Sequence, residues 1–141
     1  MVKNGGIKKA GLPPGSVVYV GKSKKDMVKI DIFNYSKTEF IHHVAKSVEE
    51  CFPFKDKPGV TWINVDGVHQ TYIIDELGRH FQLHDLVIED IANTNQRPKI
   101  ELHPHYLYMV LKMVYHNQHH ARITEQISII LGENFDLLSG E

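Results

Sequence analysis

Two adjacent carboxylates, Glu89 and Asp90, are the side chains of this sequence best suited to bind a metal ion. Hard divalent cations such as Mg²⁺ prefer oxygen ligands, and one or two carboxylates suffice where the ion keeps much of its water. Apolar residues recur around the pair at the spacing of an amphipathic helix, which predicts a short helix over residues 84–93. Both acids and Leu86 then lie on its outer side. Taken alone, this pattern is more typical of a solvated helix face than of a metal site.

The ten histidines are a second possible set of metal ligands, because imidazole is the commonest ligand for zinc and related ions. A zinc site needs about four converging ligands, usually at fixed Cys or His spacings, and the sequence has no such spacing. We therefore interpret the histidines as surface residues without a ligand role. Five of them gather in two predicted turns: His103, His105, His116, His119 and His120.

The composition excludes several classes of function. A length of 141 residues fits one globular domain, and 16 basic against 17 acidic side chains provide no general field for nucleic acid or an anionic membrane. Cys51 is the only cysteine, which rules out an intramolecular disulfide and favours a reducing compartment. Neither Cys51 nor Ser128 has the surroundings of a nucleophile. We expect no membrane-spanning segment, because the sequence lacks a run of about 18 apolar residues. We expect no signal peptide, because no apolar run follows the basic N-terminus.

The elements that position the acids are predicted from periodicity. Alternating patterns indicate strands near both ends of the chain, and helical patterns indicate helices in the middle. This order favours a mixed α/β fold, in which helices pack on a largely antiparallel sheet. Pro98 makes the chain leave the second helix in an extended conformation. The predicted strands span residues 16–21, 27–33, 60–65, 99–102, 106–115, 123–131 and 135–138, and the predicted helices span residues 70–81 and 84–93.

Three local signals lead to further expectations. Ser36 can cap a short helix over residues 38–41. Two prolines indicate a loop over residues 52–59. The strand over residues 60–65 is largely apolar on both faces, which predicts a central strand with Trp62 in the core.

Several motifs occur in the order found in a known family. Together they resemble the cytoplasmic N-terminal domain of the CorA magnesium and cobalt transporters, from about Gly11 to about Leu138. Six motifs in the same order are more specific than any one of them, and the resemblance implies the fold of the CorA soluble domain. The motifs are Gly11-Leu12-Pro13-Pro14-Gly15 and the segments over residues 60–67, 86–91, 96–99, 110–113 and 123–128.

The resemblance assigns a role to both acids. In CorA transporters the aspartate matching Asp90 faces an acidic residue on the stalk of a neighbouring subunit, with Mg²⁺ between them. The glutamate matching Glu89 lies near this interface and can support a second ion. The implied function is a cytoplasmic domain that senses Mg²⁺, Co²⁺ or another divalent ion and gates the channel. The expected location is the cytoplasmic face of the inner (plasma) membrane.

The resemblance also implies the partners. The intact protein is expected to be a pentamer, and this domain is expected to contact its own stalk and transmembrane helices, which lie beyond Glu141. We expect no contact of this part with nucleic acid or with the membrane itself. Residues 1–141 are expected to form one regulatory domain without enzymatic activity, with residues 1–10 disordered.

The sequence departs from the family at two places. Asp85 stands where the family commonly has proline; both residues suit a helix N-terminus, so the helix is expected to persist. Residues 139–141 differ from the sequence that usually follows in the family. Natural divergence and the end of a cloned segment are both open as explanations.

Three alternatives remain open. The histidines favour slightly the zinc-transporting ZntB branch of the same superfamily. A free-standing metal-dependent hydrolase predicts a pocket with a perturbed His or carboxylate, whereas a sensor predicts acids on a convex helix. A pure protein-interaction module predicts no response to divalent ions.

Overall fold

A single seven-stranded sheet and three helical elements make up the computed structural model, which describes residues 11–20 and 27–140. The strands are β1 (Lys29–Tyr35), β2 (Phe40–Ala45), β3 (Val60–Asp66), β4 (Lys99–Leu102), β5 (Tyr106–His116), β6 (Arg122–Gly132) and β7 (Phe135–Gly140). The helical elements are the 3₁₀ helix η2 (Val48–Phe54) and the α-helices α1 (Thr71–His80) and α2 (Asp85–Ile91). This is the predicted mixed α/β fold.

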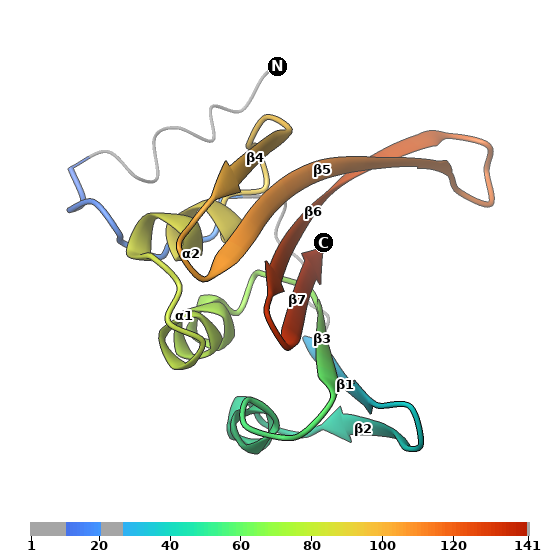
Figure 1. The fold of residues 1–141 in the computed structure, drawn as a ribbon. Helices are drawn as coiled ribbons and strands as arrows, with labels where there is room; N and C mark the ends of the chain where they lie inside the picture. Colours follow the sequence, from blue (N-terminus) through green and yellow to red (C-terminus); the bar gives the residue numbers. More distant parts are fainter. Residues whose placement is uncertain (1–10, 21–26, 141) are drawn as a thin grey trace.

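The strand order is β2-β1-β3-β7-β6-β5-β4. Every neighbouring pair is antiparallel except β3 and β7, whose parallel pairing joins the β2-β1-β3 part of the sheet to the β7-β6-β5-β4 part. Helices α1 and α2 lie on one side of this curved sheet (Figure 1). Within residues 11–20 and 27–140, no helix covers the opposite side.

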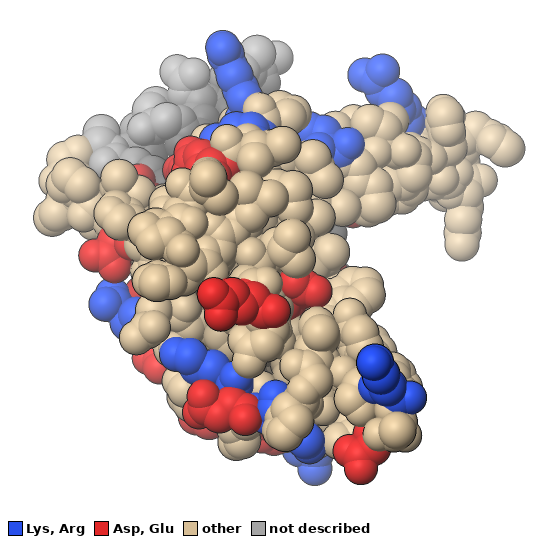
Figure 2. Space-filling model, viewed as in Figure 1, with Lys and Arg blue, Asp and Glu red and all other residues tan. Residues whose placement is uncertain are grey.

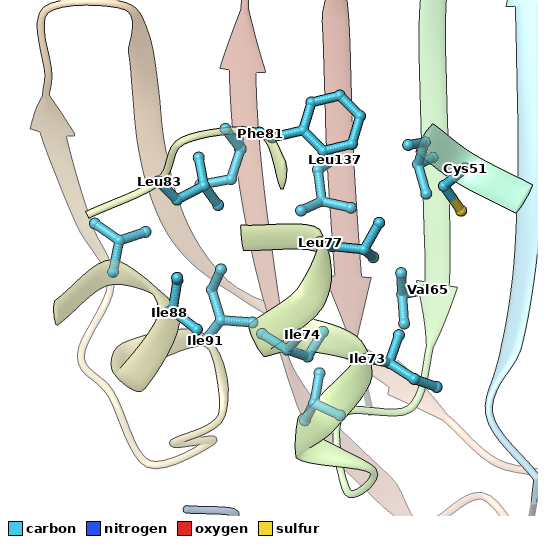
Figure 3. Close-up of a cluster of buried hydrophobic side chains, with 14 of the residues drawn as sticks. Cys51, Val65, Ile73, Ile74, Leu77, Phe81, Leu83, Ile88, Ile91 and Leu137 are labelled. Atoms are coloured by element: carbon cyan, nitrogen blue, oxygen red, sulfur yellow. The ribbon is translucent and has the colours of Figure 1, made fainter. Parts of the chain in front are cut away.

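The core lies between the sheet and the helices (Figure 3). Alternate strand residues such as Ile63, Tyr108 and Leu137 point to this side and are at most 1% exposed. Burial of such a side chain stabilises the fold by roughly 1.5–3 kcal/mol. Apolar residues of the two α-helices complete the core: Ile73, Ile74, Leu77, Val87, Ile88 and Ile91.

Strand β3 is central, as predicted, but only one of its faces is buried. Thr61, Ile63 and Val65 are inaccessible, whereas Trp62 is 41% exposed. The prediction of Trp62 as a core residue was therefore wrong. It lies on the side of the sheet without helices, next to Phe33, at a ring-centroid distance of 5.7 Å.

The helix predicted over residues 38–41 is absent, because this segment enters strand β2. The Ser36 hydroxyl instead accepts hydrogen bonds from the backbone N–H groups of Thr38 and Glu39, at 3.3 and 3.1 Å, and so closes the β1–β2 turn. Pairing along the whole of β1 offers more hydrogen bonds than a single helical turn, and it overrides the local capping signal.

Two other segments differ from expectation. The loop predicted over residues 52–59 begins as the last turn of η2, which extends to Phe54 and contains Pro53. The strand predicted over residues 16–21 is reduced to one parallel bridge between Val20 and Asn93. Residues 1–10 and 21–26, which include the last residue of the strand predicted over residues 16–21, lie outside the described residues.

Candidate functional site

Helix α2 holds Glu89 and Asp90 toward solvent because its opposite side is buried. The His84 side chain caps the helix, since its Nδ1 accepts a hydrogen bond from the Leu86 N–H at 3.2 Å. The His84 N–H in turn donates to the Tyr106 hydroxyl of β5 at 3.0 Å. Leu86 is 49% exposed, as predicted. Both acids are partly exposed on the same outer side.

The Asp90 carboxylate is held by two donors. Gln96 Nε2 donates to Oδ1 at 2.6 Å, and Lys99 Nζ donates to Oδ2 at 2.6 Å. The Asp90 side chain is 25% exposed. The carboxylate is thus fixed in orientation while part of it remains open to solvent.

Lys99, at the start of β4, connects Asp90 to a second acid. Its ammonium also lies 2.6 Å from Glu101 Oε1 and 5.2 Å from the ring centroid of Tyr108. Partial burial lowers the pKa of Lys99, but the hydrogen bonds to Asp90 and Glu101 outweigh this effect, and the pKa is raised. The hydrogen bond from Lys99 lowers the pKa of Glu101. Lys99 and Glu101 are therefore a charged pair at neutral pH.

A buried glutamine fixes the segment that carries these donors. Gln126 of β6 is 4% exposed. Its Nε2 donates to the Asn93 carbonyl at 3.0 Å, and its Oε1 accepts from the Gln96 N–H at 3.0 Å and from Lys112 Nζ at 3.1 Å. Because each polar atom of this buried amide has a partner, the path from α2 to β4 is well defined.

Glu89 is tied to a different part of the chain. Its Oε2 accepts a hydrogen bond from the Gly15 N–H at 2.8 Å. Glu89 also borders an open groove of about 270 Å³. Among the described residues the lining is mostly apolar, and Glu89 is its only titratable side chain. These lining residues are Leu12, Pro13, Pro14, Ser16, Leu86 and Glu89.

The histidines do not converge on a metal site in the part of the chain that the structure describes. No group of three or more His, Cys, Asp or Glu residues is placed there to hold an ion. His103 stacks on Tyr106 with ring centroids 4.5 Å apart, and His42 stacks on Phe33 at the same separation. Burial raises the pKa of the Cys51 thiol to about 12, so this group is a neutral thiol at physiological pH.

Comparison with known proteins identifies the family. The model of the family described as "CorA-like Mg2+ transporter protein" matches residues 57–138. The chain belongs to this family. The resemblance seen in the sequence motifs is confirmed.

A CorA relative supports this assignment at the sequence level. The "Cobalt/magnesium transport protein CorA" of Thermotoga maritima is 43% identical over 134 residues, which cover 94% of this chain and 38% of the relative. The chain therefore spans 38% of the length of that CorA protein. No helix within residues 11–20 and 27–140 is long and apolar enough to cross a membrane.

Solved structures support the CorA soluble-domain fold. The complete CorA magnesium transporter from Methanocaldococcus jannaschii matches with a TM-score of 0.52 and 10% identity, over 78% of this chain and 31% of that one. The full-length CmaX protein matches with a TM-score of 0.59 and 13% identity, over 84% of this chain and 36% of that one. At these identities the likeness concerns the fold alone.

The carboxylates on α2 are suitable ligands for a hydrated Mg²⁺ ion and can form part of a site. Each carboxylate oxygen has two lone pairs. Asp90 Oδ1 and Oδ2 each accept one hydrogen bond from a described side chain, so both can still accept a metal-bound water. Mg²⁺ keeps several waters and needs only one or two carboxylates. The positive charge of Lys99 opposes the binding of a cation at Asp90, because its Nζ lies 2.6 Å from Asp90 Oδ2.

Sequence reasoning found the two acids but missed the side chains around them. The structure brings Gln96 and Lys99 to Asp90, Glu101 to Lys99, and Gly15 to Glu89. Pro98 gave a partial signal, because it predicts that the chain leaves α2 in an extended conformation, and Lys99 follows it directly. The sheet register that places this lysine under α2 has no local signature.

Proposed function

We propose that this chain is the cytoplasmic regulatory domain of a CorA-type magnesium or cobalt channel, spanning residues 1–141. Asp90 is the main ligand of a regulatory Mg²⁺ ion, and Glu89 supports a second ion. The ion lies between neighbouring subunits of a pentamer, at the cytoplasmic face of the inner membrane, where the domain works as a sensor and has no catalytic role. Co²⁺ or another divalent ion can take the place of Mg²⁺.

One observation carries the proposal: Asp90 presents an oriented, partly exposed carboxylate on the outer face of a helix in a chain of the CorA family. Its neighbour Glu89 is also partly exposed, so a second subunit can reach both acids. The partner acid comes from the stalk of a neighbouring subunit, and Asp90 supplies half of the site.

The mechanism is electrostatic. With Mg²⁺ bound, carboxylates from two subunits share one divalent cation and hold the subunits together. When the ion leaves, two like charges about 4 Å apart repel each other by about 4 kcal/mol at an effective dielectric constant near 20, before salt screening. Summed around a ring, this repulsion biases a two-state assembly toward its open form. Falling cytoplasmic Mg²⁺ then opens the channel, and rising Mg²⁺ closes it.

The test is Asp90→Asn in the intact transporter, reconstituted in liposomes, with ion uptake measured as a function of Mg²⁺ on the cytoplasmic side. Asn keeps an oxygen acceptor for Gln96 but loses the charge that binds the ion. We expect the Mg²⁺ concentration for half-inhibition to rise by about threefold to tenfold, the effect of one lost charge interaction near a surface.

Asp75→Asn is the matched control, because Asp75 lies on α1 and pairs with Arg79 of the same helix. Asp75→Asn removes the same charge away from Glu89 and Asp90, so we expect the Mg²⁺ concentration for half-inhibition to stay at the wild-type value. An inhibition curve that is the same for Asp90→Asn and wild type would show that Asp90 is not the sensor.

A further inference from the structure

The ammonium of Lys99 makes the contacts that a bound cation would make. It lies 2.6 Å from Asp90 Oδ2 on α2 and 2.6 Å from Glu101 Oε1 on β4. The ring of Tyr108, on β5, lies beneath it at 5.2 Å. Two carboxylates and an aromatic face thus surround one positive charge, which is an arrangement that stabilises a cation.

The position of Lys99 is set by the fold. Its backbone pairs with Val110 in the β4–β5 register, and its side chain is only 27% exposed. By contrast Lys29, which pairs with Asp31 at 2.8 Å, is 58% exposed and lies on β1, far from β4 in the strand order. Lys99 is therefore held at Asp90 by its surroundings.

A divalent ion that approaches Asp90 meets this positive charge. Oδ2 accepts a hydrogen bond from the ammonium and Oδ1 from the Gln96 amide, so one lone pair of each oxygen is already used. Like charges a few ångströms apart repel in a partly buried setting. The lysine stem is flexible, and Glu101 gives the ammonium a second anchor when it leaves Asp90.

We propose that Lys99 is a tethered competitor of the divalent cation at Asp90. The ion binds as the ammonium shifts from Asp90 toward Glu101, and this competition keeps the affinity of the site low. The inference rests on the proposed function, because it takes Asp90 as a ligand of the ion. A low affinity suits a sensor of an abundant ion, since a site that stays saturated cannot report a change in concentration.

The experiment is a Mn²⁺ titration of this chain, followed by the paramagnetic broadening of backbone amide NMR signals around Asp90. For Lys99→Met we expect half-maximal broadening at a Mn²⁺ concentration about threefold to tenfold below that of wild type. Lys99→Arg keeps the charge and should stay within about twofold of wild type. Lys29→Met removes an equal charge from the other end of the sheet and should also stay within about twofold.

Asp90→Asn separates this inference from the proposed function. If it abolishes the broadening while Lys99→Met matches wild type, the competitor role of Lys99 is wrong and Asp90 remains the ligand. If Asp90→Asn and wild type are both broadened and to the same degree, the ion binds elsewhere and the proposed sensor fails. Absence of broadening in both wild type and Lys99→Met also overturns the inference. Lys99→Gln repeats the test with a polar side chain, should Lys99→Met fail to fold.

Discussion

At the scale of single residues, the two acids of α2 have different surroundings. The Asp90 carboxylate accepts hydrogen bonds from two side chains that follow it within nine positions of the sequence, Gln96 and Lys99. Glu89 accepts from the backbone of Gly15, 74 positions away. Glu89 therefore links the segment before β1 to the helix, besides any part in ion binding.

Gly15 is well suited to this link. Its φ of +84° is accessible to glycine without strain, and a Cβ added there would lie 3.1 Å from the Cβ of Asp85. The backbone of Gly15 can therefore approach α2 closely enough to donate to Glu89.

We predict that Glu89→Ala frees the Gly15 amide, whereas Glu89→Gln preserves its hydrogen bond through the amide oxygen. The loss of one hydrogen bond to a partly exposed charged acceptor costs about 0.5–1.5 kcal/mol. Hydrogen exchange of the Gly15 amide should accelerate by about threefold to tenfold in Glu89→Ala and stay near wild type in Glu89→Gln. Equal protection in all three proteins would show that Glu89 does not hold this segment.

At the scale of elements, the sequence predicts most of the fold because periodic patterns coincide with burial. Helix α1 and strands β3 to β7 agree with their predicted ranges within two residues at each end. Local capping and turn signals were less reliable. The signal at Ser36 is real, since the hydroxyl does accept two backbone hydrogen bonds, but it closes a hairpin.

Long-range pairing explains what could not be predicted. Strand β2 is mostly exposed and shows no clean alternation, so only its pairing with β1 defines it. The exposure of Trp62 depends on which side of the sheet the helices cover. The same holds for the site: Glu89 and Asp90 follow from helical periodicity, whereas Lys99 reaches Asp90 only through the register of β4.

The contact between α1 and α2 depends on one glycine. A Cβ added to Gly78 would lie 2.5 Å from Cγ1 and Cδ1 of Ile88, which is itself 1% exposed. Glycine thus lets the two helices approach, although it costs about 1 kcal/mol of helix propensity relative to alanine.

We predict that Gly78→Ala lowers the free energy of unfolding by about 1–2 kcal/mol, because overpacking outweighs the gain in propensity. Ile88→Val removes Cδ1, one of the two clashing atoms, and costs about 1 kcal/mol alone. The loss of unfolding free energy in the double variant should be smaller than the sum of the two single losses by at least about 0.5 kcal/mol. Urea denaturation measures all three, with the exposed Glu76→Ala as a near-neutral control. Strict additivity would contradict this packing contact.

At the scale of the whole molecule, charge and packing are unevenly distributed. Charged side chains of both signs are interspersed over the body, while the projecting end of the β5–β6 hairpin is largely uncharged on the face in view (Figure 2). This end extends beyond the rest of the sheet (Figure 1). Strand β4 pairs with β5 only as far as Val110, and β7 pairs with β6 only from Ile127.

The projecting end of the hairpin, residues 113–125, is thus a two-stranded ribbon whose strands pair only with each other among the residues that the structure describes. It exposes Met113, Val114 and Tyr115, which are 42%, 57% and 39% exposed, and adds little to the core. An isolated two-stranded ribbon is marginally stable, so it opens without unfolding the body.

We therefore predict that native-state hydrogen exchange separates the molecule into two levels of stability. Hydrogen-bonded amides of the ribbon should exchange with a free energy of opening at least about 2 kcal/mol below that of Ile63, Tyr108 and Ile130 in the body. Addition of urea at low concentration should leave the ribbon exchange nearly unchanged, because its opening exposes little surface, and should accelerate exchange in the body. Ribbon amides that exchanged only with global unfolding would show that the projecting end folds and unfolds together with the core.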